Sequence, residues 1–191
     1  MAPVARLCSH NDDKLRELRA ALPEWEIELL GADDFPPETG ATYYDNALGK
    51  ARFGRSTGPA EAWMVGEDSG IEVDGIGGRP GVHSARFGGD DPTGRLLAEL
   101  RDADGDGRHA RYVCELVALS PAGEEVRGTG VLEGRIAAAP RGSEGFGYDP
   151  VFVPDGEEQT VAELGNAWKR SNSHRARAAA ALAANLEIPA T

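Results

Sequence analysis

Residues 3–22, PVARLCSHNDDKLRELRAAL, decide the fold because they change from a strand pattern to a helix pattern within one short stretch. PVARLC is short and mostly apolar, as in a buried strand, whereas Leu15, Leu18 and Leu22 recur at the spacing of one helix face. Polar residues join the two segments, and a proline follows the last leucine. A strand, a loop and a helix in this order predict an α/β fold.

The same alternation continues along the chain. The patterns predict helices over residues 43–55, 90–103 and 173–188, and strands over residues 62–67, 71–76, 111–120 and 126–138. Alternation within RYVCELVALS predicts that Tyr112, Cys114, Leu116 and Ala118 face one way and Val113, Val117 and Leu119 the other. No repeat or linker divides the sequence, so we expect one domain over residues 1–191 with a mixed sheet flanked by helices.

The composition is that of an ordinary globular protein, with 40% hydrophobic residues among 191 and a net charge of −12. The negative charge argues against binding to polymeric nucleic acid or acidic membranes, but it does not exclude a small phosphate ligand. The first residues lack the apolar core of a signal peptide and no apolar run is long enough to span a membrane, so we expect a cytoplasmic protein. Cys8 and Cys114 lie far apart without metal-ligand spacing, which indicates two reduced core thiols.

The polar stretch before the first helix is the first candidate site. A loop that leads into a helix presents free backbone N–H groups and the positive end of the helix dipole, which suits a phosphate. Lys14 in the first turn is unfavourable for that dipole unless an anion compensates it. The alternative, that Asn11 or Asp12 only caps the helix and Lys14 is solvated, is favoured when this stretch is taken alone.

Acidic residues form the second candidate site: Glu38, Glu67 and Asp68. Mg²⁺ takes one or two carboxylates together with waters and substrate phosphates. Neighbours in an extended strand point to opposite faces, so Glu67 and Asp68 reach one site only if the strand ends or bends at Gly70. A plain turn at Asp68-Ser69-Gly70 explains the sequence equally well.

One face of the predicted helix 43–55 carries polar side chains spaced three and four residues apart. Tyr43, Asn46 and Lys50 therefore point toward one site if the helix forms. Lys50 would bring a positive charge to that site.

The third candidate site is SEGFGYDPVF, residues 143–152, a stiff loop with two aromatic residues. A nucleobase can stack on such an aromatic face, but the aromatic rings can equally plug the core beside a tight turn. The fourth site is WKRSNSHRARA, residues 168–178, where cations gather near the start of the last helix, with Ser173 as its possible cap. In an acidic chain this indicates a polar or anionic ligand, and a solvated helix end is the alternative.

Together, and in this order, these stretches resemble the inosine/xanthosine triphosphate pyrophosphatase family, whose members hydrolyse non-standard purine nucleoside triphosphates to monophosphate and pyrophosphate. The resemblance runs through LCSHNDDKLREL, ETGATYYDNALGKA, EDSGIEVDGIGGRPGVHSARFGG, GFGYDPVF and KRSNSHRARA. It implies an elongated, two-lobed α/β fold with a central mixed β-sheet and an active-site cleft between the lobes. It also implies a homodimer and Mg²⁺ as cofactor.

The resemblance also implies roles for single residues. It assigns proton acceptance to Asp68, metal binding to Glu38, Glu67 and Asp68, and catalytic roles to Lys14, Lys50 and Glu67. The implied substrate contacts are Ser9, His10, Asn11, Asp12, Asp13, Lys14, Ser69, Phe146, Gly147, Tyr148, Asp149, Lys169, His174 and Arg175. His10 stands where the family commonly has glycine, and glutamate at Glu67 where many bacterial members have aspartate.

Two other classes stay open at this point: a nucleotide-binding regulatory module without turnover, and a pyrophosphatase of the Maf type. The retained Asp68 and Lys14 argue against the first. Against the second, residues 173–175, SHR, match a motif that reads the 6-oxo edge of a purine.

Overall fold

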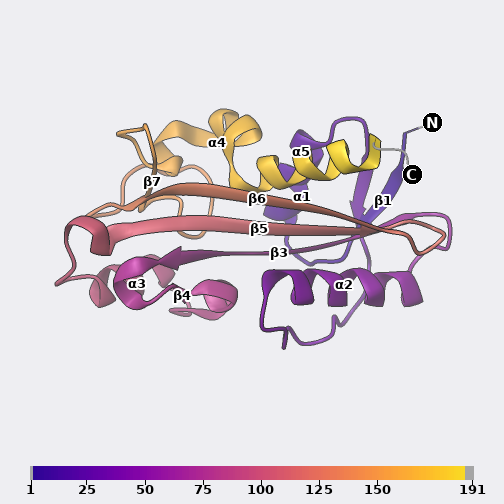
Figure 1. Ribbon diagram of the computed structural model, residues 1–191, viewed down its shortest axis with the longest axis horizontal. Helices are drawn as coiled ribbons and strands as arrows, with labels where there is room; N and C mark the ends of the chain where they lie inside the picture. Colours follow the sequence, from indigo (N-terminus) through magenta and orange to yellow (C-terminus); the bar gives the residue numbers. More distant parts are fainter. Residues whose placement is uncertain (1, 188–191) are drawn as a thin grey trace. The chain divides into compact units, whose positions relative to one another are not determined.

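The computed structural model describes residues 2–187, which form helices on both faces of a β-sheet (Figure 1). The helices are α1 (Asp12–Ala21), α2 (Tyr43–Thr57), α3 (Pro92–Glu99), α4 (Val161–Asn172) and α5 (His174–Glu187). The strands are β1 (Val4–Leu7), β2 (Glu26–Leu29), β3 (Trp63–Val73), β4 (Arg79–Pro80), β5 (His109–Leu119), β6 (Glu125–Ile136) and β7 (Phe152–Pro154).

The sheet is mixed. Its strand order is β2-β1-β3-β5-β6-β7, and β4 pairs with β3 outside this path. β1 runs parallel to β2 and β3, whereas β4 and β7 run antiparallel to β3 and β6. In the β1–β3 pair, Leu7 lies opposite Val65. The predicted α/β fold with a mixed sheet is confirmed.

The chain divides into two compact units, and the first comprises Met1–Asp68, Cys114–Gly130 and Arg175–Thr191. In this unit α1 and α5 pack on one face of the strands and α2 packs on the other (Figure 1). The alternation of β5 matches this arrangement, because Leu116 lies in the core with α1 and α5 and Val117 in the core with α2. The predicted two faces of β5 are therefore confirmed in this unit.

Helix α2 lies unusually close to β3 at Gly66. A Cβ atom at Gly66 would come within 1.8 Å of the carbonyl oxygen of Ala47, so only glycine allows this approach. The contact fixes α2 against the strand one residue before Glu67 and two before Asp68. The close packing at Gly66 thus determines where the polar side chains of α2 meet β3.

The second unit comprises Ser69–Val113 and Val131–His174. Its core joins the remaining parts of the long strands to α3, β7 and α4, and includes Tyr112, Tyr148 and Phe152. α3 lies within the predicted helix 90–103 but ends at Glu99. Asp91 caps it by accepting a hydrogen bond from the backbone N–H of Gly94, and a proline occupies its first turn.

The sequence-based expectations differ from the structure in several places, and the short strands β2, β4 and β7 were not among the predicted elements. The segments 62–67 and 71–76 form one strand, β3, up to Val73, and the chain does not turn at Asp68-Ser69-Gly70. Helix α4 has no counterpart among the predicted elements, although its start carries a capping box of Thr160 and Glu163. Ile188, at the end of the last predicted helix, lies outside the described residues.

Candidate functional site

The loop before α1 is organised by its own polar side chains. Asn11 caps the helix, since its Oδ1 accepts from the backbone N–H of Lys14 at 3.0 Å, and Ser9 Oγ accepts from Asn11 N at 3.1 Å. His10 turns to the neighbouring segment, where Nε2 lies 2.7 Å from the carbonyl oxygen of Ala32 and the ring contacts Phe35 edge-on. The capping role of Asn11 is therefore confirmed.

Lys14, by contrast, is not solvated. Its Nζ lies 2.5 Å from Oε2 of Glu67, whose side chain is fully buried. The other oxygen of Glu67 accepts from Nε and an Nη atom of Arg175, at 3.2 and 2.9 Å, and Arg175 also donates to Glu17 at 2.5 Å. Residues from α1, β3 and α5 thus form one buried network of two cations and two carboxylates.

This network sets the ionisation of Glu67. Burial alone would raise the pKa of its carboxyl group, but the positive charges of Lys14, Arg175 and Lys50 lower the pKa well below its usual value. Glu67 is therefore ionised at neutral pH and has two cationic partners. The same surroundings raise the pKa of the Cys114 thiol well above its usual value, chiefly through burial and through the negative charge of Glu67.

Asp68 lies on the opposite face of β3, next to α2. Asn46 Nδ2 donates to Asp68 Oδ2 at 2.9 Å, and Lys50 Nζ lies 3.7 Å from Asp68 Oδ1. Lys50 also donates to the backbone carbonyl of Glu67 at 2.8 Å and forms an ion pair with Glu38. Of the three side chains predicted to converge, Asn46 and Lys50 meet at Asp68, whereas Tyr43 is a buried residue at the start of α2.

The ionisation of Asp68 differs from that of Glu67. Burial raises its pKa, the positive charge of Lys50 and the hydrogen bond from Asn46 oppose this, and the charges of Glu67 and Glu38 add to the rise. The net result is a pKa above the usual value of an aspartate. The pKa of Lys50 is also raised, since three carboxylates outweigh the effect of its burial. Asp68 is accordingly a buried carboxylate that accepts a proton more readily than an exposed one.

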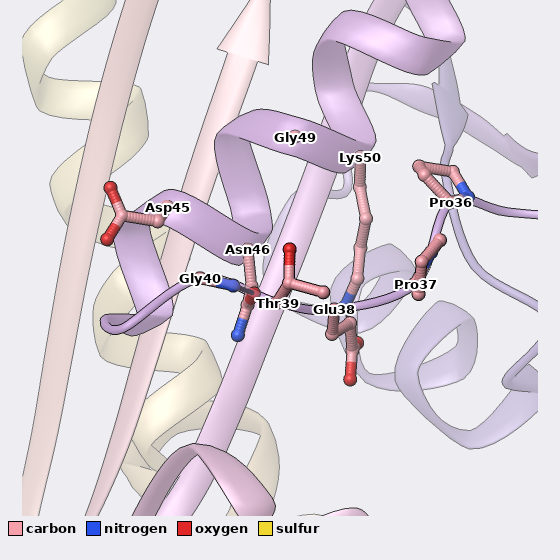
Figure 2. A pocket seen from close by; sticks show the side chains of 9 residues that line it. All are labelled: Pro36, Pro37, Glu38, Thr39, Gly40, Asp45, Asn46, Gly49 and Lys50. Carbon is pink, nitrogen blue, oxygen red and sulfur yellow. Dashed lines mark hydrogen bonds and ion pairs between the residues drawn. The ribbon is translucent and has the colours of Figure 1, made fainter.

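A pocket of about 240 Å³ opens beside this group (Figure 2). Its walls come from the loop before α2 and from the first turns of that helix. The lining residues are Pro36, Pro37, Glu38, Thr39, Gly40, Asp45, Asn46, Gly49 and Lys50. Glu38 and Lys50 come together at one side of it, while Asn46 Oδ1 accepts from the backbone N–H of Gly40 at 2.8 Å and ties the loop to the helix.

The three acids predicted to bind metal are not equivalent. Glu38 and Asp68 share Lys50 as their cationic partner, whereas the carboxylate of Glu67 faces Lys14 and Arg175 across the strand. Over residues 2–187, no three His, Cys, Asp or Glu side chains gather closely enough to hold a metal ion. Two carboxylates still suit Mg²⁺, which completes its octahedral shell with waters and substrate phosphates. The donor set therefore fits for Glu38 and Asp68, and not for Glu67.

In the second unit, Asp149 organises the aromatic loop. Its Oδ2 accepts from the backbone N–H of Phe146 at 2.8 Å and from Lys169 Nζ at 2.6 Å, and that ammonium lies 4.6 Å from the centre of the Phe146 ring. A Cβ atom at Gly145 would lie 2.2 Å from Asp149 Oδ2, and φ of Gly145 is +78°, so glycine is required there. Phe146, Asp149 and Lys169 thus form one rigid group.

His174 joins this group through a residue that the sequence reasoning did not select. The ring of Tyr112 stacks on the imidazole of His174, with 4.5 Å between centres and 10° between planes, and its hydroxyl donates to Asp149 Oδ1 at 3.2 Å. The alternation of β5 indicated only that Tyr112 faces inward, as a core residue does. Because its partners come from residues 37 and 62 positions further on, no local signal identifies it.

The remaining predicted site residues lie in three places. Tyr148 is buried in the second unit, and its hydroxyl donates to the carbonyl oxygen of Ser84 at 3.0 Å. Ser69 follows Asp68 within β3, and Gly147, in the aromatic loop, has a φ of +62°. Asp12 and Asp13 lie in the first turn of α1, where Asp13 pairs with Arg16 at 2.7 Å. Cys8 and Cys114 are free and buried, as expected.

No helix within the described residues has the length and apolar character needed to cross a lipid bilayer.

Comparison with known proteins adds to these observations. The chain is 46% identical over 181 residues to the dITP/XTP pyrophosphatase of Symbiobacterium thermophilum, covering 91% of this chain and 90% of that protein. It is 45% identical to the dITP/XTP pyrophosphatase of Mycobacterium bovis over the full length of both. Its structure is similar to that of a HAM1 protein from Coxiella burnetii, with a TM-score of 0.83, 32% identity and coverage of 96% and 98% of the two chains. Since the Ham1 family also matches residues 5–185, the chain belongs to the Ham1 family.

Proposed function

We propose that the protein is a nucleoside triphosphate pyrophosphatase that hydrolyses non-standard purine nucleoside triphosphates, namely ITP, dITP and XTP, to the monophosphate and pyrophosphate. Relatives that match nearly the whole chain bear the name dITP/XTP pyrophosphatase. One observation of the structure carries the proposal further. Asp68, with its raised pKa, is held by Asn46 and Lys50 beside Glu38 and the pocket of about 240 Å³.

Asp68 would orient the attacking water and take its proton. A base works best when its pKa lies near the working pH, and in the metal-free protein burial raises the pKa of Asp68 in that direction. Asn46 donates to only one oxygen of the carboxylate, Oδ2, and so fixes its orientation. In-line attack on the α-phosphorus would then release pyrophosphate.

Lys50 and Lys14 would stabilise charge on the phosphates. Both are held by carboxylates, Lys50 by Glu38 and Lys14 by Glu67, so their ammonium groups are positioned before a substrate binds. Glu67 then acts by holding Lys14 and Arg175. We propose Glu38 and Asp68 as the residues that hold Mg²⁺, which when bound would neutralise the triphosphate and the leaving pyrophosphate.

The aromatic group of the second unit would recognise the base. Phe146 offers a flat face, and its ring already lies against the ammonium of Lys169. His174 and Arg175 would donate to the 6-carbonyl of hypoxanthine or xanthine, where adenine carries an amino group. We keep Ser9, His10, Asn11, Asp12, Asp13, Ser69, Gly147, Tyr148 and Asp149 as proposed substrate contacts.

Three further expectations belong to this proposal: one functional domain over residues 1–191, a homodimer, and a cytoplasmic location. Two free, buried thiols are consistent with a reducing compartment.

The deciding experiment is product analysis. The purified protein with Mg²⁺ should release pyrophosphate and monophosphate from ITP, dITP and XTP, and should act far less on ATP. Release of orthophosphate with a diphosphate product would show a different cleavage site. Nucleotide binding without any product would indicate the regulatory module instead.

A further inference from the structure

Tyr112 contacts two other rings within the second unit. Its ring stacks on His174, with 4.5 Å between centres and 10° between planes, and also contacts Phe152, with 4.5 Å between centres and 43° between planes. Tyr112 and His174 are each 6% exposed, and Phe152 is fully buried. Because the Tyr112 ring lies parallel to the imidazole at contact distance, it restricts rotation of the imidazole about its last side-chain torsion.

The hydroxyl of Tyr112 has a second partner. It donates to Oδ1 of Asp149, whereas Oδ2 of the same carboxylate accepts from Phe146 N and from Lys169. Both oxygens of Asp149 therefore accept hydrogen bonds. The bond from the Tyr112 hydroxyl to Oδ1 fixes the rotation of the carboxylate. Because Phe146 and Lys169 donate to the same carboxylate, the hydroxyl of Tyr112 also helps to hold these two residues in place.

We propose that Tyr112 is a positioning residue for base recognition. It holds the plane of His174 with its ring and the Asp149–Lys169–Phe146 group with its hydroxyl, so one side chain aligns both parts of the base-reading surface. The inference rests on the proposed function, since it concerns how the same site distinguishes purines. Positioning of this kind affects selectivity more than turnover, because the residues that perform the chemistry lie elsewhere.

The two contacts of Tyr112 can be separated by substitution. Tyr112→Phe keeps the ring that stacks on His174 and removes the hydroxyl that donates to Asp149, whereas Tyr112→Leu removes both the ring and the hydroxyl. Loss of one such buried hydrogen bond should raise KM for ITP roughly tenfold with kcat almost unchanged. Tyr112→Leu should in addition lower the ratio of kcat/KM for ITP over ATP by roughly tenfold or more, because the imidazole loses its fixed plane.

Phe152→Leu is the matched control. It removes an aromatic ring that contacts Tyr112 in the same core, but it leaves the contacts of Tyr112 with His174 and Asp149 in place. It should lower the melting temperature as Tyr112→Leu does, while the ITP/ATP ratio stays near the parent value. A purely structural role for Tyr112 would instead make the two leucine variants alike in both measurements.

An independent measurement uses NMR. The stacked ring of Tyr112 should shift the Cε1 proton of His174, assigned with His174→Gln, upfield, and this shift should persist in Tyr112→Phe and disappear in Tyr112→Leu. A folded Tyr112→Leu protein with the parent KM and the parent ITP/ATP ratio would overturn the inference. An inactive parent protein would instead refute the proposed function, and the inference would fall with it.

Discussion

The carboxylates of Glu67 and Asp68 lie on opposite faces of β3 and carry opposite pKa shifts. Glu67 faces Lys14 and Arg175 and has a lowered pKa, whereas Asp68 faces Asn46 and Lys50 and has a raised one. Two neighbouring acids on one strand therefore differ in how readily they accept a proton. Glu67 is a permanent charge within an ion-pair network, and Asp68 is a group suited to accept a proton.

Asp68→Asn should separate activity from stability. The amide keeps the shape of the side chain but cannot accept a proton, so pyrophosphate release from ITP should fall by a factor on the order of 10² or more. The folded-state pKa of Asp68 is raised, so its ionised form disfavours folding at neutral pH, and the variant should melt at the parent temperature or above. A variant that unfolds well below the parent and keeps its turnover would identify Asp68 as a structural residue.

Glu67→Gln should show the opposite behaviour. Replacing the buried partner of Lys14 and Arg175 should lower the free energy of unfolding by roughly 3–5 kcal/mol at neutral pH. Because the folded-state pKa lies well below 4.5, the stabilising charge is fully present above about pH 4.5. It is lost as the pH falls through the lowered pKa, so the difference between parent and variant should shrink in acid. Denaturant unfolding between roughly pH 3 and 7 measures the difference in the free energy of unfolding between the parent and the variant, because carboxylic acids titrate in about this range.

Glu72→Gln provides the control for that series. Glu72 lies on the same strand and pairs with the exposed Arg111 at 2.7 Å, so its loss should cost no more than about 1 kcal/mol at any pH. If Glu67→Gln and Glu72→Gln lowered the free energy of unfolding equally, the stabilising role proposed for the buried network would be wrong.

Gly66→Ala tests the contact between α2 and β3. The added methyl group would meet the carbonyl of Ala47, so the helix must move away and carry Asn46 and Lys50 from Asp68. We expect a loss of stability of about 1–3 kcal/mol and a sharp loss of turnover. Gly49→Ala is the matched change on α2, since nothing lies within 4 Å of its Cβ position, and it should gain up to about 1 kcal/mol. Thermal unfolding followed by circular dichroism compares the stability of the two variants and tests this expectation.

Metal removal should abolish activity. Glu38 and Asp68 beside a highly charged triphosphate would repel it without a cation. Chelator-treated protein should be inactive and regain activity with Mg²⁺, and Glu38→Gln should need a higher Mg²⁺ concentration for half-maximal activity. Binding can be followed separately, because Mg²⁺ should raise the melting temperature of the parent more than that of Glu38→Gln. Full turnover in excess chelator would refute the metal proposal.

Arg175→Lys should test the proposed base reading. Lysine keeps a positive charge near Glu67 but loses the planar guanidinium that now contacts Glu67 and Glu17. If Arg175 also donates to the 6-carbonyl, the ratio of kcat/KM for ITP over ATP should fall by a factor on the order of 10 to 10². An unchanged ratio in the folded variant would assign Arg175 to the ion-pair network alone.

Periodic patterns were sufficient to predict much of the fold. The apolar alternation of β5 placed Leu116 and Val117 on opposite faces, and the leucine spacing of α1 gave its buried face. Both signals depend on neighbours within one element, which is why they can be read locally. The capping role of Asn11 could be read for the same reason.

The contacts that depend on distant residues could not be predicted. Asp68-Ser69-Gly70 has the composition of a turn, but β3 continues through it, and the cations that pair with the buried Glu67 come from the distant helices α1 and α5. Lys14 was expected to meet phosphate or solvent, and its partner is 53 positions further along the chain. Helix α4 was missed although its capping box is visible in the sequence, and Gly165, with a φ of +81°, interrupts its pattern.

The pairing of β1 with β3, in which Leu7 lies opposite Val65, has a consequence for how the protein tolerates insertions and deletions. Successive side chains on a strand alternate, so a slip of one residue after Val65 would turn both acids to the opposite faces of the sheet. With one residue inserted, Glu67 would take the place of Asp68 beside Asn46, while Asp68 would move to the face of Lys14 and Arg175, one position further along the strand. Both acids would still be present, but Lys14 and Arg175 would lose the carboxylate that pairs with them.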